Sequence, residues 1–457
     1  MPDEREFDVV VIGGGPAGEV CVGRLGDHGL EVALVEDELI GGECSYYACM
    51  PSKGLLRPAE LLAEALRVPG VREAVTGQLD VQSALDRRDE IIHDLDDSGQ
   101  AAWLDRHGVE LVRGQGRLDG ERRVVVDGRA LSARRAVIVA TGTGSLIPPI
   151  PGLADARPWT NREATTAKAV PERLLILGGG VVGVEMAQAW SSLGSTVTLV
   201  EALARLISSE EEFASEQVAD GLRERGVDIR TAARATEVSR GDAGVTLRLE
   251  GGDELTGDEL LVSIGRHPHT DDLGLETVGM EPGEPIEVDD RMRSSRHEWL
   301  YAIGDVNGRS LLTHMGKYQA RLLADRLAGK ADIPATQDGP VAPRVIFTDP
   351  QVAAVGHTLA SAREAGHNAR AVDGSTADSA GASYVGRNTP GTSRLVVDQD
   401  REVVIGATFV GVEVAEWLHA ATIAVVGEVP IERLRHAVPA FPTRSEVWLY
   451  LLQDYWN

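Results

Sequence analysis

Two segments of this 457-residue chain share one pattern of apolar and polar positions. Residues 7–12 and 174–177 are nearly continuous apolar runs, which is typical of parallel strands buried on both faces. Each run leads into a glycine-rich turn and a helical stretch, and a second apolar run follows at 32–35 and at 197–200. The pattern therefore predicts two βαβ units and an α/β fold with parallel sheets.

The turn in each unit matches G-x-G-x-x-G, and the second strand of each unit ends at an acid. The glycines permit a tight turn and let the backbone approach a pyrophosphate, while the acid accepts hydrogen bonds from a ribose. These residues are Gly13, Gly15, Gly18 and Glu36 in the first unit, and Gly178, Gly180, Gly183 and Glu201 in the second. We expect a dinucleotide at each unit. The Glu201 carboxylate would repel the 2′-phosphate of NADP, which favours NAD at the second unit.

Two further apolar strands are expected to end in turns that suit a nucleotide cofactor. Residues 136–139 lead into Thr141 and Gly142, and residues 300–303 lead into the pair Gly304-Asp305. The Asp305 carboxylate could serve a sugar or ribityl hydroxyl, although an isolated Gly-Asp more often only ends a strand.

The remaining sequence predicts a chain of several domains. Residues 55–107 are expected to be mainly helical, and residues 341–457 alternate strands with amphipathic helices. Stretches that contain proline and glycine near 148–157 and 332–343 indicate domain joints.

Composition excludes several classes of protein. A net charge of −26 opposes binding to nucleic acid or to an anionic membrane surface. Residues 1–6 lack the basic start and apolar stretch of a secretory leader, and no apolar run is long enough to span a membrane. Three cysteines do not make a secreted disulfide framework. We therefore expect a cytoplasmic protein.

Two of the three cysteines, Cys44 and Cys49, form a closely spaced pair shortly after the first unit. In a cytosolic protein such a pair is more often catalytic or metal-binding than structural. Lys53 and the start of a helix would lower a thiol pKa and favour the thiolate. Inert packing thiols and half of a metal site are the alternatives, but no histidine or further cysteine lies nearby. Cys21 is expected in the core. The pair indicates transfer of electrons from a bound cofactor to a disulfide.

In this order, the motifs resemble those of the pyridine nucleotide–disulfide oxidoreductases, flavoproteins that include lipoamide dehydrogenase, glutathione reductase and mercuric reductase. The resemblance covers essentially the whole chain. It rests on the two glycine motifs and on Cys44…Cys49-Met50-Pro51-Ser52-Lys53, Ala140-Thr141-Gly142, Gly265-Arg266-His267-Pro268, Gly304-Asp305 and Phe347-Thr348-Asp349-Pro350…Val355-Gly356. It implies two Rossmann-like dinucleotide-binding domains and a C-terminal α+β interface domain that forms a homodimer.

The resemblance also implies how the chain is divided. Residues 1–150 and 271–338 would form a discontinuous FAD-binding domain, residues 151–270 an NAD(P)-binding domain, and residues 339–457 the dimerisation domain. The cofactors would be FAD and NAD(H), with NADP less favoured. The substrate would be a disulfide-type small molecule or small protein, and no metal ion is expected.

Individual residues acquire roles by the same resemblance. Cys49 would be the charge-transfer thiol against the flavin, and Cys44 the interchange thiol that meets the substrate. Lys53 would lie near the reactive edge of the flavin, paired with Glu185. The implied cofactor contacts are Gly13, Gly15, Gly18, Glu36, Gly42, Lys53, Thr141, Gly142, Gly178, Gly180, Gly183, Glu201, Arg266, Gly304 and Asp305.

The redox segment departs from the family's pattern, C-x-N-x-G-C. Tyr46 replaces the asparagine and Ala48 replaces the glycine. Tyr46 and Tyr47 would either narrow the substrate channel, offer a phenol as proton donor, or simply pack.

A larger departure lies near the C-terminus, where the family reads H-P-T-x-S-E. Phe441 stands in place of the histidine, so a general-base contribution of about 10²–10⁴-fold must be replaced or absent. His436 either reaches the site by another path or is an ordinary surface or interface residue. Glu446 remains a candidate catalytic residue, with a purely structural hydrogen-bond acceptor as its alternative. The chain also lacks the C-terminal cysteine pair of mercuric reductases.

The leading hypothesis is a homodimeric FAD enzyme that uses NADH to reduce a disulfide or similarly soft acceptor through Cys44 and Cys49. In a competing hypothesis, electrons leave the flavin directly for a quinone, dye or metal ion, and the cysteines are vestigial. A third, from another class, is a non-catalytic flavoprotein that acts as a redox sensor or assembly component.

Overall fold

The computed structural model describes residues 5–457, so residues 1–4 of the N-terminal segment discussed above lie outside it. The chain divides into two compact units, which are described separately. Unit 1 comprises Met1–Pro51, Asp89–Leu146 and Gly265–Gly339, and unit 2 comprises Ser52–Arg88, Ile147–Ile264 and Pro340–Asn457.

Unit 1 is built on a seven-stranded sheet with parallel strands at its centre. β1 pairs with β2 and β6, while β3 extends the sheet beyond β2, and both β16 and the antiparallel strand β5 pair with β6. The strands are β1 (Arg5–Ile12), β2 (Val32–Glu36), β3 (Val109–Arg113), β4 (Gly116–Leu118), β5 (Arg123–Val126), β6 (Arg129–Val139) and β16 (Leu300–Ala302), with β7 (Thr143–Ser145) and β15 (Arg266–Pro268) as a separate pair.

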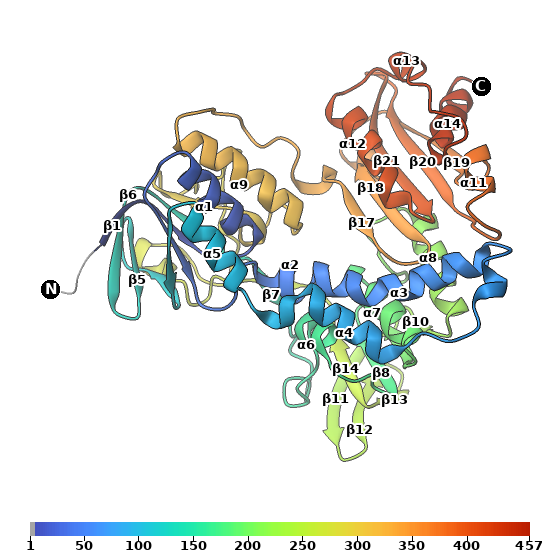
Figure 1. Cartoon of the computed structure of the whole chain (residues 1–457), viewed down its shortest axis with the longest axis horizontal. Helices are drawn as coiled ribbons and strands as arrows, with labels where there is room; N and C mark the ends of the chain where they lie inside the picture. The colour runs from blue at the N-terminus through green and yellow to red at the C-terminus, as the bar shows by residue number, and fades with distance from the viewer. Residues whose placement is uncertain (1–4) are drawn as a thin grey trace. The chain divides into compact units, whose positions relative to one another are not determined.

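Both faces of the parallel strands in unit 1 are covered, which explains their nearly continuous apolar sequence. Val9 and Val11 of β1 face one core cluster, whereas Val10 and Ile12 face another on the opposite side of the sheet. Helices α1 and α9 lie side by side over the first face (Figure 1). The helices of this unit are α1 (Pro16–Asp27), α2 (Gly42–Tyr46), α5 (Ser98–Arg106) and α9 (Thr313–Leu327).

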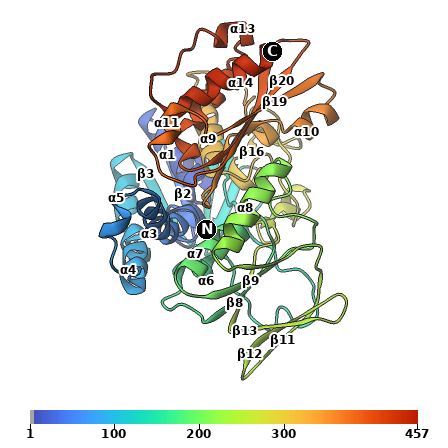
Figure 2. The ribbon, with the colours of Figure 1, turned by 90° about the vertical axis from the view of Figure 1, so that its right-hand side faces the viewer.

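Unit 2 contains a second parallel sheet, in the order β10-β9-β8-β14. Its core includes Trp190, which is fully buried on α7. A three-stranded antiparallel meander, β11-β12-β13, projects beyond this sheet (Figure 2). The elements are α6 (Asn161–Thr166), β8 (Arg173–Leu177), α7 (Val181–Ser192), β9 (Thr196–Val200), α8 (Glu212–Glu224), β10 (Asp228–Arg230), β11 (Ala235–Gly241), β12 (Gly244–Leu249), β13 (Glu254–Gly257) and β14 (Glu259–Val262).

The C-terminal part of unit 2 is an antiparallel sheet in the order β17-β18-β21-β20-β19. One core cluster joins its strands to helices α12 and α14. The elements are β17 (Arg344–Ile346), β18 (Gln351–Gly356), α10 (Leu359–Glu364), β19 (Ala369–Ser375), α11 (Ala380–Ser383), β20 (Thr392–Asp398), β21 (Val403–Gly411), α12 (Leu418–Val426), α13 (Ile431–Leu434) and α14 (Val447–Trp456).

The remaining elements are helical. Helices α3 and α4 contain two of the five positions at which the chain passes from one unit to the other. Their bounds, with those of the 3₁₀ turns, are α3 (Cys49–Arg67), η1 (Arg72–Ala74), α4 (Val81–Ile91), η2 (His93–Leu95), η3 (Leu275–Val278), η4 (Gly304–Asn307), η5 (Gly339–Val341), η6 (Val414–Trp417) and η7 (Arg444–Glu446). Within residues 5–457, none of the helices combines the length and hydropathy that a membrane span requires.

The architecture confirms the expected mixed α/β fold. The apolar runs at 7–12, 32–35, 174–177 and 197–200 are all strands of parallel sheets.

Candidate functional site

The first glycine turn, between β1 and α1, is shaped for close approach of a ligand. Gly13 has a φ of 103°, and a Cβ on Gly18 would lie 1.9 Å from the Gly13 carbonyl oxygen, so both positions require glycine. No described atom lies within 4 Å of a Cβ placed on Gly15, which leaves this backbone open at the helix N-terminus. An open backbone with a positive helix end fits the pyrophosphate of FAD.

Glu36 closes this turn from the end of β2. Its Oε2 accepts a hydrogen bond from the Gly14 N–H at 2.5 Å, and its Oε1 accepts one from the Glu38 N–H at 2.7 Å. Burial raises the pKa of Glu36, and the two backbone hydrogen bonds partly oppose that shift. Each carboxylate oxygen can accept a further hydrogen bond, so Glu36 can still receive a ribose hydroxyl.

The second glycine turn, between β8 and α7 in unit 2, repeats this construction. Gly178 has a φ of 112°, and a Cβ on Gly183 would lie 1.9 Å from the Gly178 carbonyl oxygen. The Glu201 carboxylate accepts hydrogen bonds from the N–H groups of Gly179 at 2.6 Å and Leu203 at 2.7 Å. Gly180 is open, with no described atom within 4 Å of a Cβ placed on it. These residues fit a second dinucleotide.

The contrast between Gly180 and Gly183 gives a test of nucleotide binding in unit 2. We expect Gly180→Val to raise the KM for NADH by about tenfold or more, because its side chain would occupy the space open to the pyrophosphate. The unfolding midpoint of the apoprotein should not change. Gly183→Ala should instead destabilise the fold by about 1–3 kcal/mol, because its Cβ meets a carbonyl group. Equal effects of both variants on stability would contradict this assignment.

Asp305, the second residue of η4, lies in a polar cluster of unit 1. Its Oδ2 accepts a hydrogen bond from Thr143 Oγ1 at 3.0 Å and lies 3.8 Å from Arg266 Nε. Arg266 also donates to Thr143 Oγ1 at 2.6 Å. Burial raises the pKa of Asp305, against the opposing effects of Arg266 and Thr143. The predicted cofactor residues Asp305 and Arg266 thus lie together, and a half-buried carboxylate suits a ribityl hydroxyl.

The Thr141-Gly142 turn is held by the chain that follows β15. Thr141 Oγ1 donates to the His269 carbonyl oxygen at 2.9 Å, and Gly142 has a φ of 68°. Gly42 packs against the first glycine turn, since a Cβ on it would lie 2.8 Å from Gly15 Cα. Together with Asp305, these residues give unit 1 the shape and hydrogen-bonding groups that FAD requires.

The two cysteines of the redox segment lie side by side in unit 1. Cys44 belongs to α2, Cys49 begins α3, and both are half-buried free thiols within hydrogen-bonding reach of each other. The contact with Cys49 and burial raise the pKa of the Cys44 thiol, while Thr313 and Lys317 act to lower it. The structure therefore brings the predicted pair close enough for thiol–disulfide exchange.

Thr313 and Lys317, both on α9, are site residues that the sequence did not reveal. Cys49 Sγ and Thr313 Oγ1 share a hydrogen bond at 3.5 Å. The N-terminal end of α9 therefore faces the thiols, and a helix N-terminus stabilises a nearby thiolate. The only available signal was that a helix begins soon after the predicted Gly304-Asp305 turn.

Cys21 differs from the other two cysteines. It is fully buried on α1, and burial raises the pKa of its thiol to about 12. It is therefore a core residue, as expected from the sequence.

Lys53 and Glu185 form an ion pair in unit 2, with 2.7 Å between Nζ and Oε2. The lysine also lies 4.6 Å from the centroid of the Phe347 ring. Glu185 is 3% exposed, and its second carboxylate oxygen accepts the Phe347 N–H at 3.0 Å. The buried carboxylate thus fixes both the lysine and the backbone at the end of β17.

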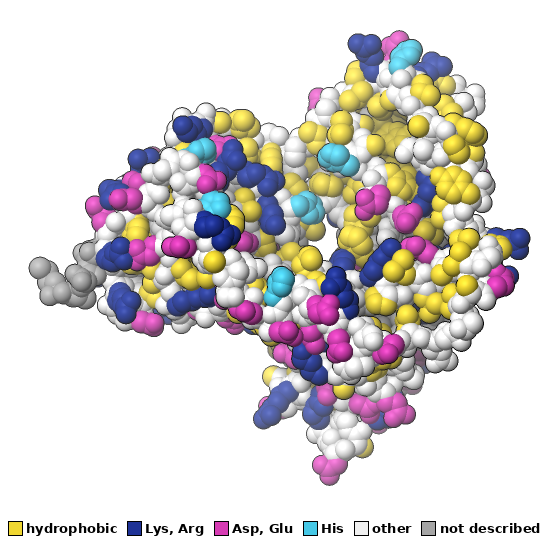
Figure 3. Space-filling model, viewed as in Figure 1, with side chains coloured by type: hydrophobic (Ala, Val, Ile, Leu, Met, Phe, Trp, Pro, Cys, Tyr) yellow, Lys and Arg dark blue, Asp and Glu magenta, His cyan; other side chains and the backbone are white. Residues whose placement is uncertain are grey.

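The segment around Phe441 is open to solvent in the single chain. The Phe441 side chain is 77% exposed, and His436 is also exposed. In the space-filling view, hydrophobic side chains gather over the C-terminal part of unit 2 (Figure 3). Glu446 is buried, and its Oε2 accepts a hydrogen bond from the Gly381 N–H at 3.1 Å. That contact matches the structural alternative for Glu446.

Tyr46 packs in the interior of unit 1. It is 1% exposed, and its hydroxyl donates to the Asp96 carbonyl oxygen at 3.4 Å. Burial, together with nearby carboxylates, raises the pKa of Tyr46 to about 12. Tyr47 is half-buried, with its ring centroid 6.4 Å from that of Tyr46. Of the two tyrosines, only Tyr47 is partly accessible.

Across residues 5–457, no group of three or more histidine, cysteine, aspartate or glutamate side chains is arranged to hold a metal ion.

Two protein-family models match successive regions of the chain. Residues 7–320 match the pyridine nucleotide-disulphide oxidoreductase family, and residues 342–451 match the dimerisation domain of that family.

Curated relatives align over almost the full length. The dihydrolipoyl dehydrogenase of Haloferax volcanii is 31% identical over 452 residues, covering 96% of this chain and 94% of the relative. That of Chlorobaculum tepidum is 33% identical over 455 residues, covering 96% and 95%. The mercuric reductase of Staphylococcus aureus is 28% identical over 450 residues, covering 97% of this chain and 81% of the relative.

Solved structures show the same fold. The HOCl-induced flavoprotein disulfide reductase RclA from Escherichia coli superposes with a TM-score of 0.86 at 26% identity, covering 98% of this chain and 99% of RclA. LpdA from Mycobacterium tuberculosis gives a TM-score of 0.85 at 26% identity, covering 99% of both chains. The chain therefore belongs to the pyridine nucleotide–disulfide oxidoreductases, flavoenzymes whose cofactors are FAD and NAD(H).

Proposed function

We propose that this chain uses NADH to reduce a disulfide or a similarly soft acceptor through Cys44 and Cys49, without the C-terminal histidine of its family. The observation that carries the proposal is the position of the two thiols. They touch each other at the N-terminal end of α9, in the same unit as the FAD-shaped turn and Asp305.

In this proposal, three regions of the chain have separate functions. We assign FAD binding to residues 1–150 and 271–338, NAD(H) binding to residues 151–270, and dimerisation to residues 339–457. Residues 265–270 lie in unit 1, where Arg266 joins the FAD site. The match to a dimerisation domain supports a homodimer. The exposed side chains of Val438 and Phe441 would then be covered by, or lie near, the second subunit.

Substrate reduction in this proposal is an exchange of sulfur–sulfur bonds. The Cys44 thiolate attacks one sulfur of the substrate disulfide, which breaks the substrate bond and releases one thiolate. Cys49 then attacks the Cys44 sulfur, which forms the Cys44–Cys49 disulfide and releases the second thiolate. The released thiolates take up the protons that the two cysteines lost. When bound, FAD and NADH supply the two electrons that return the pair to thiols.

Other residues in the proposal position the reacting groups. Thr313 donates a hydrogen bond to the Cys49 thiolate, and Lys317 adds positive charge near Cys44. Glu185 holds the Lys53 ammonium group in place. Glu446 acts as a structural acceptor for the Gly381 N–H, since no histidine stands at position 441 for it to orient.

Alkylation of the thiols before and after reduction tests the proposal. We expect the oxidised holoenzyme to resist iodoacetamide, and one equivalent of NADH to make Cys44 reactive, as read by peptide mass spectrometry. Alkylation should abolish NADH-dependent reduction of lipoamide or glutathione disulfide. Cys21 serves as an internal control, because its burial should keep it unmodified in both states.

Turnover with a quinone distinguishes the proposal from direct electron transfer out of the flavin. The alkylated enzyme should still reduce a quinone with NADH, since that route needs neither thiol. If the alkylated enzyme retained full turnover with the disulfide, the thiols could not be its route and the proposal would be wrong.

A soft metal ion is a second candidate acceptor. Two adjacent thiols suit such an ion, because thiolates are soft ligands. A curated relative is named mercuric reductase, and RclA has been solved as a Cu(II) complex. NADH oxidation that depends on Cu(II) or Hg(II) and is lost on alkylation would support this acceptor. If neither Cu(II) nor Hg(II) stimulates NADH oxidation, a soft metal ion is excluded as the acceptor.

A further inference from the structure

A buried chain of hydrogen bonds in unit 1 ends at the turn that carries Asp305. Gln319 of α9 is fully buried, and its Nε2 donates to Asp338 Oδ2 at 2.9 Å. Its Oε1 accepts hydrogen bonds from the Gly304 N–H at 2.8 Å and from Asn307 Nδ2 at 2.9 Å. Gly304 and Asn307 are the first and last residues of η4. The single amide of Gln319 therefore holds both ends of this turn.

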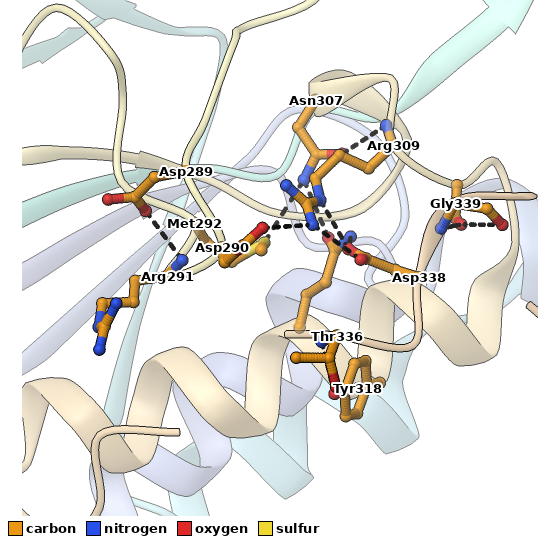
Figure 4. A network of polar contacts seen from close by, with 12 residues as sticks. Asp289, Asp290, Arg291, Met292, Asn307, Arg309, Tyr318, Thr336, Asp338 and Gly339 are labelled. Carbon is orange, nitrogen blue, oxygen red and sulfur yellow. Dashed lines mark hydrogen bonds and ion pairs between the residues drawn. The ribbon is translucent and has the colours of Figure 1, made fainter. Parts of the chain in front are cut away.

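The carboxylate of Asp338 determines the orientation of the Gln319 amide. Arg309 donates to both carboxylate oxygens of Asp338, from Nε and from Nη2, each at 2.8 Å (Figure 4). Burial acts to raise the pKa of Asp338, but the hydrogen bonds from Arg309 and Gln319 outweigh it and lower the pKa. An ionised carboxylate only accepts hydrogen bonds, so the NH₂ group of Gln319 must face it. The carbonyl oxygen of Gln319 is then left for Gly304.

The position of Gly304 is set closely, and it fixes the position of Asp305. Gly304 has a φ of 74°, and a Cβ on it would lie 3.2 Å from the Ala17 Cβ of α1. A Cβ on Gly316 of α9 would lie 3.2 Å from Gly304 Cα. The turn is thus wedged between two helices and tied by its N–H to Gln319. Asp305, the next residue, presents its carboxylate beside Thr143.

We propose that Gln319 and Asp338 are positioning residues for FAD, which hold the Gly304-Asp305 turn in the orientation that the cofactor needs. The proposal rests on the role assigned to Asp305 in binding FAD. The acceptor-only carboxylate of Asp338 fixes the Gln319 amide, and the Gln319 carbonyl fixes the turn. Asp338 lies in the same segment of unit 1 as Asp305, and it contributes to the FAD site through Gln319, without contact with the cofactor.

A reciprocal exchange tests this chain of contacts. Gln319→Glu places a second carboxylate against Asp338, and Asp338→Asn removes the acceptor-only group. Each single variant should weaken FAD binding by about tenfold, as measured by fluorescence when FAD is added to the apoprotein. In the double variant, the NH₂ group at position 338 can donate to the new carboxylate at position 319, which still accepts from Gly304. The same NH₂ group, however, faces Arg309 Nε, which is also a donor. The FAD affinity of the double variant should therefore recover only in part, to about threefold or more above that of either single variant.

Asp325→Asn is the matched control. Asp325 also lies on α9 and accepts two hydrogen bonds from an arginine, Arg24, at 2.5 and 2.8 Å, but it has no link to η4. It should lower the apoprotein unfolding midpoint and leave FAD affinity within about threefold of wild type.

Asp305→Ala separates failure of the inference from failure of its premise. If Asp305→Ala weakens FAD binding but neither Gln319→Glu nor Asp338→Asn does, the inference is wrong and the role of Asp305 stands. If Asp305→Ala has no effect either, the premise is wrong. The inference would also be wrong if the double variant lost as much FAD affinity as the two single variants combined, because independent sites do not rescue each other.

Discussion

In the Cys44→Ser variant, we expect NADH-dependent reduction of a disulfide to fall by about 10³-fold or more, because a serine hydroxyl cannot replace the thiolate as nucleophile. Cys49→Ser should lose turnover to a similar extent, since the mixed disulfide on Cys44 could no longer be resolved. Steady-state turnover with lipoamide and with glutathione disulfide measures both effects.

Cys21→Ala is the control for removal of a thiol. Cys21 lies in the core of unit 1, so this variant should lose stability but keep disulfide turnover per bound FAD. Quinone reduction should persist in both active-pair variants. Full disulfide turnover in either Cys44→Ser or Cys49→Ser would show that electrons reach the acceptor without the pair.

A histidine at position 441 should increase the rate of disulfide reduction. We expect Phe441→His to accelerate disulfide reduction in the homodimer by about 10²-fold, within the 10²–10⁴-fold range of a general base. The physical reason is that the Cys44 thiol has a raised pKa, so at neutral pH it is mostly protonated and lacks a base to deprotonate it. The kcat/KM values of both proteins for glutathione disulfide or lipoamide measure this acceleration.

The pH profile provides the mechanistic signature of this gain. In the native protein, thiolate forms as pH rises toward the raised pKa of Cys44, so kcat/KM should increase by about tenfold per unit above neutrality. Phe441→His should flatten that rise. Val438→His is the control, because Val438 is as exposed as Phe441, at 77%, and stands outside the family motif. An equal gain from both variants, or none from Phe441→His, would indicate a remodelled site.

The nucleotide-binding parts of the fold could be predicted because their signals are local. A strand, a glycine turn, a helix and an acid follow one another within each βαβ unit, so the residues that contact one another are close in sequence. The structure shows this directly, since Glu36 and Glu201 each accept the N–H of the second residue of their glycine turn. Short-range patterns of this kind determine the backbone with little help from the rest of the chain.

Residues brought together by long-range packing carried no such signal. Thr313 reaches Cys49, 264 positions earlier in the chain, because α9 packs against α1 in unit 1. Asp338 and Gln319 are only 19 positions apart, but no strand, turn or motif pattern links them. Nothing in the local sequence around these polar residues distinguishes them from surface positions. Tyr46 shows the opposite case, in which a residue beside the redox thiol was a candidate proton donor and is instead buried in the core.

Anaerobic titration of the oxidised holoenzyme with NADH tests the redox role of Cys44 and Cys49 most directly. The first equivalent should produce a long-wavelength absorption band from the Cys49 thiolate beside the flavin, with little loss of the main flavin band and about two new thiols per FAD. The band should be absent in Cys49→Ser. Bleaching of the main flavin band by the first equivalent in the native protein, with neither the long-wavelength band nor new thiols, would contradict a redox-active Cys44–Cys49 pair.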